Sequence, residues 1–328
     1  FQKLDPQDLV TSIESATAAA WSNNTPTLTT CFTSSTQESS NTGLYYLNVY
    51  QTGSTDASAA IQYSIAYADQ YGSGSLFYNS LVSGSSPTRT IYGQYRTLIL
   101  GDENAQFVFG GITSSYFYAL SIERVKEHLL PGTMTLQLSG SLGGSLALSG
   151  SLLLTDDSAY TTTITRNDAG RVYNLISGSA GVRTSSTKDS ASLGYTKSSG
   201  SYGWFLPDVG LILLNGNALS SSGATWATDG ILQMQINRTA NFNGNNNRSM
   251  SLAISGAKNF LLNSEETLSS DYVFVRARSG ESNYSENPSY ISSSTGEIVY
   301  SSFINNPITY ITTIGLYNDN NELLAVSK

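Results

Sequence analysis

Hydrophobic positions near the start of the chain recur with the spacing of an α-helix. The side chains that share this spacing are Leu9, Ile13, Ala16 and Ala20. Asp5 can cap the first turn, and Pro6 suits the first helical position, where the N–H that it lacks would have no partner. The pattern therefore predicts a helix between Asp5 and Trp21.

Beyond this segment, hydrophobic and polar residues alternate with the period of two that is typical of β-strands. The clearest alternation runs through residues 61–67, where Ile61, Tyr63 and Ile65 fall on one face. Further strands are predicted at residues 44–50, 106–110, 116–125, 133–138, 161–166, 172–176, 211–214, 231–236 and 272–278. No period of roughly 20–50 residues recurs, which excludes a solenoid or a propeller.

Local signals predict three further features. Residues 87–100 are expected to form a short helix with Ile91, Tyr95 and Leu98 on one side. Residues 308–316 and 323–326 flank a turn rich in Asn and Asp, which is typical of a β-hairpin. The asparagines of residues 241–247 indicate a loop.

A Gly-Ser-Leu triplet starts at Gly140, Gly144 and Gly150. We interpret residues 140–151 as a flexible or edge-strand connector. The alternative is a surface that becomes ordered against a neighbouring subunit. We therefore predict an N-terminal domain with a helix and β-strands at residues 1–139, and a C-terminal β domain at residues 152–328. The expected fold class is mainly β, with β-sandwich-like domains and a few short helices.

The composition favours strands over helices. Charged residues make up 12% of the chain, against about 25% in a typical globular protein, and Ser, Thr, Asn and Gly take their place. Tyrosine is abundant, with 21 residues against 3 tryptophans. Tyr and Thr suit a pleated, half-buried surface, whereas Ser, Thr and Asn compete with the helix backbone for hydrogen bonds.

Charge and cysteine content narrow the classes of partner. The net charge is −8 and no basic run occurs, which argues against nucleic-acid binding. No stretch reaches the roughly 20 apolar residues of a transmembrane helix, so we expect no membrane insertion, and no signal peptide is visible. The low cysteine content resembles that of a protein made in the cytosol more than that of a small secreted scaffold, and we expect synthesis in the cytoplasm. Cys31 is the single cysteine. Stability is therefore expected from packing, sheet hydrogen bonds and assembly rather than from disulfides.

Side chains for common catalytic chemistry are scarce. His128 is the single histidine, and a Ser-His-Asp triad would need two further residues to which the sequence does not point. A zinc site built on several histidines is impossible, and Cys31 adds only one thiol. The sequence contains no Walker A motif, Rossmann glycine fingerprint or EF-hand loop. We therefore predict no enzyme, no catalytic or metal-binding residue and no cofactor.

Paired carboxylates are the remaining enzymatic possibility, because a glycoside hydrolase needs two of them about 5–9.5 Å apart. The candidates are Glu123, Asp156, Asp157, Glu265 and Glu266. Adjacent carboxylates in a strand point to opposite faces, and carboxylates at turns commonly bind backbone groups. We therefore interpret these side chains as structural.

Two weaker surface signals remain. Arg276 and Arg278 share one face of a predicted strand, which suits cross-strand ion pairs or docking against an acidic neighbour. The glycosylation pattern begins at Asn23, Asn237, Asn247 and Asn283. Chains rich in Asn and Ser produce such matches by chance, so we assign no role to them.

Several longer segments resemble a known class of proteins. They are residues 62–67 followed by 72–75, then 91–96, 98–100, 129–133, 170–178, 283–288, 310–318 and 322–326. These segments resemble virion structural proteins of large phages with contractile tails, of the marine and cyanobacterial type. The closing pattern at residues 314–318 and 323–326 also resembles a motif of fibre-connecting tail proteins. The resemblance implies a tail or baseplate component, such as a wedge protein that contacts fibres, and it brings no catalytic residues.

The sequence therefore predicts a structural subunit of a phage virion, in the tail baseplate, that acts through subunit–subunit assembly. Its expected partners are other virion proteins, such as baseplate subunits and fibres, in a homo- or hetero-oligomer. Two alternatives stay open: a carbohydrate-binding or depolymerising tail spike, and a capsid decoration or surface-layer protein. We expect the N-terminal helix and the hairpin at residues 308–326 to be contact elements, because each has an apolar face.

Overall fold

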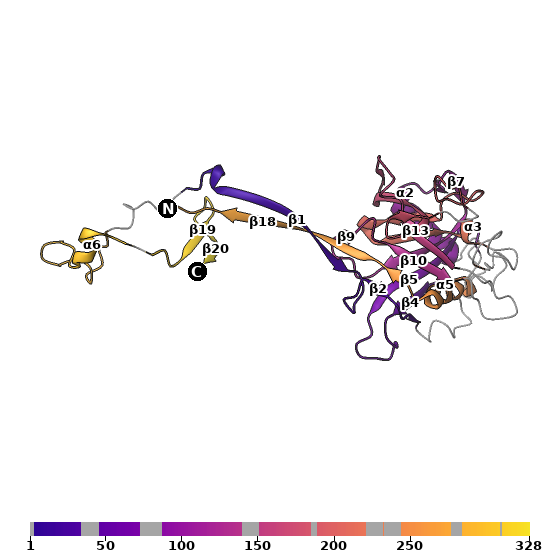
Figure 1. The fold of residues 1–328 in the computed structure, drawn as a ribbon, viewed down its shortest axis with the longest axis horizontal. Helices are drawn as coiled ribbons and strands as arrows, with labels where there is room; N and C mark the ends of the chain where they lie inside the picture. Colours follow the sequence, from indigo (N-terminus) through magenta and orange to yellow (C-terminus); the bar gives the residue numbers. More distant parts are fainter. Residues whose placement is uncertain are drawn as a thin grey trace, which may run out of the picture. The chain divides into compact units, whose positions relative to one another are not determined.

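The computed structural model describes residues 3–33, 46–72, 87–139, 151–184, 189–220, 232, 244–276, 284–308 and 310–328 (Figure 1). The chain divides into two compact units, which are described separately. Unit 1 consists of Phe1–Ile13 and Ser269–Lys328, and unit 2 is Glu14–Leu268. The predicted fold class, mainly β with sandwich-like packing and a few short helices, is confirmed.

Unit 2 is built on one large sheet whose neighbouring strands run antiparallel. The strand order is β2 (Thr27–Leu28), β17 (Phe260–Leu261), β10 (Thr135–Ser139), β11 (Ser151–Asp156), β13 (Gly170–Ser179), β15 (Gly203–Leu206), β16 (Leu211–Asn215), β8 (Tyr116–Ile122), β5 (Ile61–Asp69), β4 (Tyr46–Tyr50) and β3 (Phe32–Thr33). Two short strands, β12 (Thr165–Asn167) and β14 (Val182–Arg183), also pair with β13.

The central strands of this sheet are buried on both faces. In β8, Tyr118 and Leu120 belong to the larger of two hydrophobic clusters, whereas Phe117 and Ala119 belong to the smaller one. Strands covered on both faces are nearly continuous hydrophobic runs, which is why the sequence predicts them well. Leu136 of β10 also joins the larger cluster, although β10 lies far from β8 in the strand order. The sheet therefore curls around this cluster.

Helices cover both faces of the sheet. The smaller cluster lies beneath α2 (Pro87–Leu100), whose bounds are as predicted, and the hairpin of β6 (Phe107–Phe109) and β7 (Ile112–Ser114). Tyr92 of α2 packs against Phe107 and Phe117, with ring centroids 5.4 and 5.5 Å apart. On the other face, α5 (Gly244–Ala257) contributes Met250 and Ala253 to the larger cluster. Within the described residues of unit 2, the remaining short helical segments are η2 (Pro207–Val209) and α3 (Gly216–Leu219).

The predicted N-terminal helix is wrong. Asp5 does accept a hydrogen bond from the N–H of Gln7, but the helical segment is only the single turn η1 (Pro6–Asp8). The chain then forms β1 (Leu9–Ala19), which pairs with β18 (Asn263–Val273) in a sheet that also contains β9 (His128–Leu129). The Ser and Thr residues of this segment are weak helix formers. Its partner strand lies far along the sequence, where no local pattern can indicate it.

The domain boundary expected at residues 140–151 does not divide the structure. Residues 140–150 lie outside the described part of the chain, but β10 and β11 on either side of them pair directly, with Leu136 opposite Leu154. The predicted connector therefore joins two neighbouring strands of one sheet. The two units are instead divided within β1 and β18, each of which has residues in both units.

The remaining predictions have mixed outcomes. The terminal hairpin is confirmed as β19 (Ile314–Tyr317) and β20 (Leu323–Ser327), which belong to unit 1 together with α6 (Ser301–Asn305). The predicted loop is wrong from Gly244 onward, where α5 begins. The strand expected at residues 272–278 ends at Val273, with residues 277–278 outside the described part. The strand expected at residues 231–236 also lies outside it, apart from Leu232.

Candidate functional site

Unit 1 has no hydrophobic core among its described residues, because each of their side chains is exposed or half-buried. More than half of the large hydrophobic side chains that are exposed in the described part of the chain belong to this unit. Yet the unit contains less than a quarter of the residues. Tyr310, at 84% exposed, is the extreme case. Burial of apolar surface is the main favourable term in folding, and the described residues of unit 1 make little use of it.

Within unit 1, β1 and β18 form a two-stranded ribbon. The N–H of Phe274 donates to the carbonyl of Asp8 at 2.8 Å. The hydroxyl of Thr11 donates to the carboxylate of Asp271 at 2.6 Å, which places these two side chains on the same face. Hydrogen bonds therefore hold the ribbon together, and its described side chains are exposed or half-buried on both faces.

Both faces of the ribbon carry exposed apolar side chains. Side chains alternate along a strand, so Leu9 and Ile13 share the face of Thr11, which we call the Ile13 face. Val10 and Tyr272 lie on the opposite side, which we call the Val10 face. All four of these apolar side chains are exposed. A partner that covered only one face would leave the other in water.

The described side chains in the rest of unit 1 are also exposed or half-buried. Tyr290 packs against Tyr300 and Phe303 with ring centroids 5.6 and 5.7 Å apart, and this small aromatic group is half-buried at most. The hairpin of β19 and β20 leaves each residue of β20 exposed. A single two-stranded hairpin is only marginally stable in water, so the exposed apolar side chains of β20 have most to gain from a partner.

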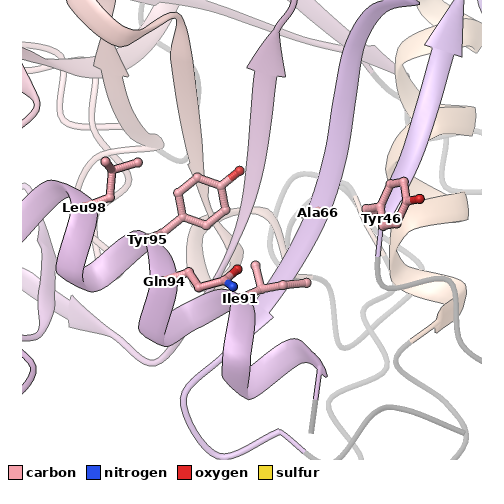
Figure 2. A pocket seen from close by; sticks show the side chains of 6 residues that line it. All are labelled: Tyr46, Ala66, Ile91, Gln94, Tyr95 and Leu98. Carbon is pink, nitrogen blue, oxygen red and sulfur yellow. The ribbon is translucent and has the colours of Figure 1, made fainter. Parts of the chain in front are cut away.

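A second candidate site is a groove of about 430 Å³ beside α2 in unit 2. Figure 2 shows the side chains of α2 on one side of it and Tyr46 of β4 on the other. Its described lining consists of Tyr46, Ala66, Ile91, Gln94, Tyr95 and Leu98. The three hydrophobic residues predicted on one side of the helix therefore line this groove. Two tyrosine rings, aliphatic groups and one amide suit an apolar side chain or a sugar ring.

The phenol of Tyr95 can act as a hydrogen-bond donor in this groove. Its burial, and to a smaller degree the charge of Glu123, raise its pKa, so the hydroxyl keeps its proton at neutral pH. Glu123 was one of the predicted carboxylate candidates, but it is not among the described residues that line the groove. The described lining contains no carboxylate.

The carboxylates of Asp156 and Asp157 are both buried and bind backbone groups. Asp156 accepts hydrogen bonds from the N–H of Gly132 on both oxygens, at 3.0 and 2.9 Å. Asp157 accepts from the backbone and side-chain amides of Asn174 at 2.9 and 3.2 Å. Burial raises the pKa of Asp157, although the hydrogen bonds from Asn174 oppose that shift. The contacts of Asp157 fix the end of β11 against β13, and those of Asp156 fix it against the turn at Gly132.

The structure brings the single histidine to a glutamate and a serine where β1, β9 and β18 meet. His128 Nε2 hydrogen-bonds to Glu265 Oε2 at 2.8 Å, and the Ser15 hydroxyl donates to Glu265 Oε1. Together these bonds lower the pKa of Glu265, with the bond from Ser15 as the larger cause. In a catalytic triad the histidine lies between the nucleophile and the carboxylate. Here the glutamate lies between the other two, so this arrangement does not activate Ser15.

The ion pair with the shortest nitrogen–oxygen distance in the described residues joins Arg171 and Asp208, and no sequence signal indicated it. Arg171 donates to Asp208 Oδ1 through Nε at 2.8 Å and Nη2 at 2.6 Å, and its backbone N–H donates to Oδ2 at 2.7 Å. Burial alone would raise the pKa of Asp208, but the hydrogen bonds and charge of Arg171 lower it overall. The pair ties β13 to η2 and is structural.

The remaining candidates from the sequence do not converge on a site. Arg276 is exposed, and Arg278 lies outside the described residues. Burial raises the pKa of Cys31, which disfavours a reactive thiolate. Of the four glycosylation patterns, Asn247 is buried in α5, Asn23 is exposed, and the other two lie outside the described residues.

The comparisons with known proteins assign no family. No protein-family profile, no curated protein and no solved structure matches this chain. Within the described residues, no group of three or more His, Cys, Asp or Glu side chains could hold a metal ion. None of the helices in the described ranges is long and apolar enough to cross a membrane. The function must therefore be argued from the surfaces of the chain itself.

Proposed function

We propose that this chain is a structural subunit of a phage tail, in the baseplate, where it acts by assembling with neighbouring virion proteins. The observation that carries the proposal is the surface of unit 1, which buries none of its described side chains and exposes many large hydrophobic ones. Large exposed apolar surfaces mark sites of interaction. Obligate interfaces are rich in apolar side chains, like the interior of a domain. Unit 1 exposes many large apolar side chains of this kind.

The location in a phage tail is supported by the sequence resemblance. Its closing segments, residues 310–318 and 322–326, coincide with the exposed hairpin of β19 and β20. The groove beside α2 in unit 2 offers a second surface for a neighbouring subunit. Neither surface needs a catalytic group, which agrees with a role in assembly.

The test is the location of the chain in purified virions that have been separated into head and tail fractions. Quantitative mass spectrometry should find the chain enriched in the tail fraction, with a copy number that matches known baseplate proteins of the same particle. Enrichment in the head fraction would favour the capsid decoration alternative. Absence from both fractions would contradict a virion role.

A second candidate function, glycan binding, is favoured by the groove beside α2. Tyr95 and Tyr46 offer aromatic faces, and Gln94 offers an amide for hydroxyl groups. Tyr95→Ala should reduce binding to a bacterial surface glycan about tenfold, which corresponds to the roughly 1.4 kcal/mol of one aromatic contact. Tyr160→Ala, which removes an exposed tyrosine elsewhere in unit 2, is the matched control. Glycan binding that both variants retain would exclude the groove.

A further inference from the structure

The pairing of β18 with β9 ends at the single histidine of the chain. The residues paired between these strands are Ser264 with Leu129 and Glu265 with His128. Ser264 is fully buried, and its hydroxyl donates to the carbonyl of His128 at 3.1 Å. Residues 267–268, the last of β18 in unit 2, are exposed. The side chains of Glu265 and His128 therefore lie where β18 changes from buried to exposed.

Two neighbouring residues, His128 and Glu127, hold this end of β18. His128 Nε2 hydrogen-bonds to Glu265 Oε2 at 2.8 Å, and both side chains are less than one-fifth exposed. Glu127 Oε2 accepts from the N–H of Thr267 at 2.7 Å, and the N–H of Glu127 donates to the carbonyl of Glu265 at 3.3 Å. The uncharged hydroxyl of Ser15 in β1 donates to Glu265 Oε1. The Glu265 carboxylate therefore links β18 to the strand on each side of it.

His128 lies within electrostatic range of three described carboxylates, which are those of Glu127, Glu265 and Asp208. Hydrogen bonds lower the pKa of Glu265 and of Glu127. For Asp208 of η2, burial raises the pKa, but the bonds and charge of Arg171 lower it overall. All three carboxylates therefore keep their negative charge at neutral pH, whereas histidine is the side chain that changes its charge between about pH 5 and 8.

Two cations next to this group are already paired. Arg171 of β13 donates to both oxygens of Asp208, and Lys126 Nζ lies 4.0 Å from Glu266 Oε2. A proton on His128 therefore adds an attraction to its carboxylate partner that the neutral ring lacks. The neutral ring still donates through Nε2 in one of its tautomers. Deprotonation then removes the charge but leaves a weaker hydrogen bond.

We propose that His128 is a pH-sensitive clamp on β18. At about pH 6 and below, the imidazolium holds the Glu265 carboxylate, and β18 stays paired with β9 as far as this residue. As the pH rises to about 8, the charge is lost and β18 loosens over residues 265–268. The strand continues directly into unit 1, so the clamp regulates the segment that leads into the apolar surface of that unit.

Hydrogen exchange of single amides in the full chain, followed by NMR, tests the clamp. The reporters are the N–H groups of Glu127 and Thr267, which bond across this end of β18. Their protection factors, corrected for the intrinsic pH dependence of exchange, should fall roughly threefold between about pH 6 and 8, which is the effect of one partly exposed ion pair. The N–H of Leu130, which donates to the carbonyl of Asn263 at 2.9 Å, should keep its protection. Reporter protection that does not change with pH overturns the clamp.

Two substitutions should abolish this pH dependence. His128→Gln keeps a group that can donate to Glu265 but cannot change its charge, and Glu265→Gln removes the carboxylate that responds to that charge. In both variants the reporter protection should be the same at the two pH values. Glu266→Gln is the matched control, because Glu266 points to the opposite face of β18, and it should keep the change. A change that survives in His128→Gln overturns the clamp.

The single histidine allows a direct check of the cause, because its ring gives one unambiguous NMR signal. The midpoint of its titration should coincide with the midpoint of the change in reporter protection. Midpoints that differ would show that another group causes the change, and would overturn the clamp. None of these readouts depends on the location of the chain in a virion, so failure of the clamp leaves the proposed function standing.

Discussion

Phe260 in unit 2 and Phe274 in unit 1 lie close together in the sequence but in opposite surroundings. Phe260 is fully buried, with its ring centroid 4.8 Å from that of Trp21 and 5.5 Å from that of Tyr63. Phe274 is 61% exposed. One ring already stabilises the single chain, whereas the other can contribute only when another surface covers it. The comparison shows that the same type of side chain is buried in unit 2 and exposed in unit 1.

The largest predicted effect comes from truncating these two rings in turn. Phe260→Ala should lower the free energy of unfolding by about 3–5 kcal/mol, because it removes a fully buried ring and leaves a cavity. Phe274→Ala should change it by less than about 0.5 kcal/mol in dilute solution, because the ring is exposed there. Urea unfolding followed by far-ultraviolet circular dichroism, which reports on the strands of both units, measures both. Equal losses for the two variants would contradict the division into a unit with a core and one without.

The ion pair of unit 2 provides the next effect in size. Asp208→Asn removes a carboxylate that accepts three hydrogen bonds from Arg171, and we expect a loss of about 1.5–3 kcal/mol in unfolding free energy. Arg171 lowers the pKa of Asp208, so the contribution is present at neutral pH and is lost as the pH falls through that lowered value. Asp319→Asn, in the exposed turn of unit 1, is the control. A similar loss of unfolding free energy in the Asp319→Asn control would show that the Arg171–Asp208 pair makes no specific contribution to stability.

A smaller effect is expected at Glu265, in the part of β18 that belongs to unit 2. Glu265→Gln weakens the contacts with Ser15 and His128 and should cost about 0.5–1.5 kcal/mol at neutral pH. The pKa of Glu265 is lowered from its ordinary value of 4.5. The contribution of Glu265 to the free energy of unfolding is therefore fully present above pH 4.5 and is lost as the pH falls through the lowered pKa.

The melting temperature, measured from neutral to acidic pH, tests this prediction. The difference in melting temperature between the original chain and the Glu265→Gln variant should vanish at acidic pH. Glu266→Gln is the matched control, because Glu266 is about half exposed and its nitrogen–oxygen distance to Lys126 is 4.0 Å. A difference that persists at acidic pH would show that Glu265 acts through packing rather than through its charge.

The strands that the sequence predicted are those with a strong local signal. β5, β8 and β16 are hydrophobic on both faces, and α2 begins at a proline and carries a regular apolar stripe. β1 was predicted as a helix and β18 only at its last two residues, because both strands are rich in polar residues and because their pairing joins distant parts of the chain. Local patterns carry no information on such a partner.

The same limit applies to the candidate sites. The sequence placed Ile91, Tyr95 and Leu98 on one side of a helix, but the opposite wall of the groove comes from Tyr46 of β4, which lies far from that helix in the sequence. It also singled out the terminal hairpin and the N-terminal segment as contact elements. The N-terminal segment is a strand rather than a helix, so its two apolar faces could be recognised only from its pairing with β18.

Hydrogen exchange, compared between assembled and dissociated chains, tests the central claim most directly. The account predicts that amides of β5 and β8 exchange slowly in both states, because unit 2 has its own core. The amides of β19, β20 and the unit 1 parts of β1 and β18 should exchange rapidly in dissociated chains and become protected on assembly. Equal exchange of these strands in the two states would contradict the claim that assembly completes unit 1.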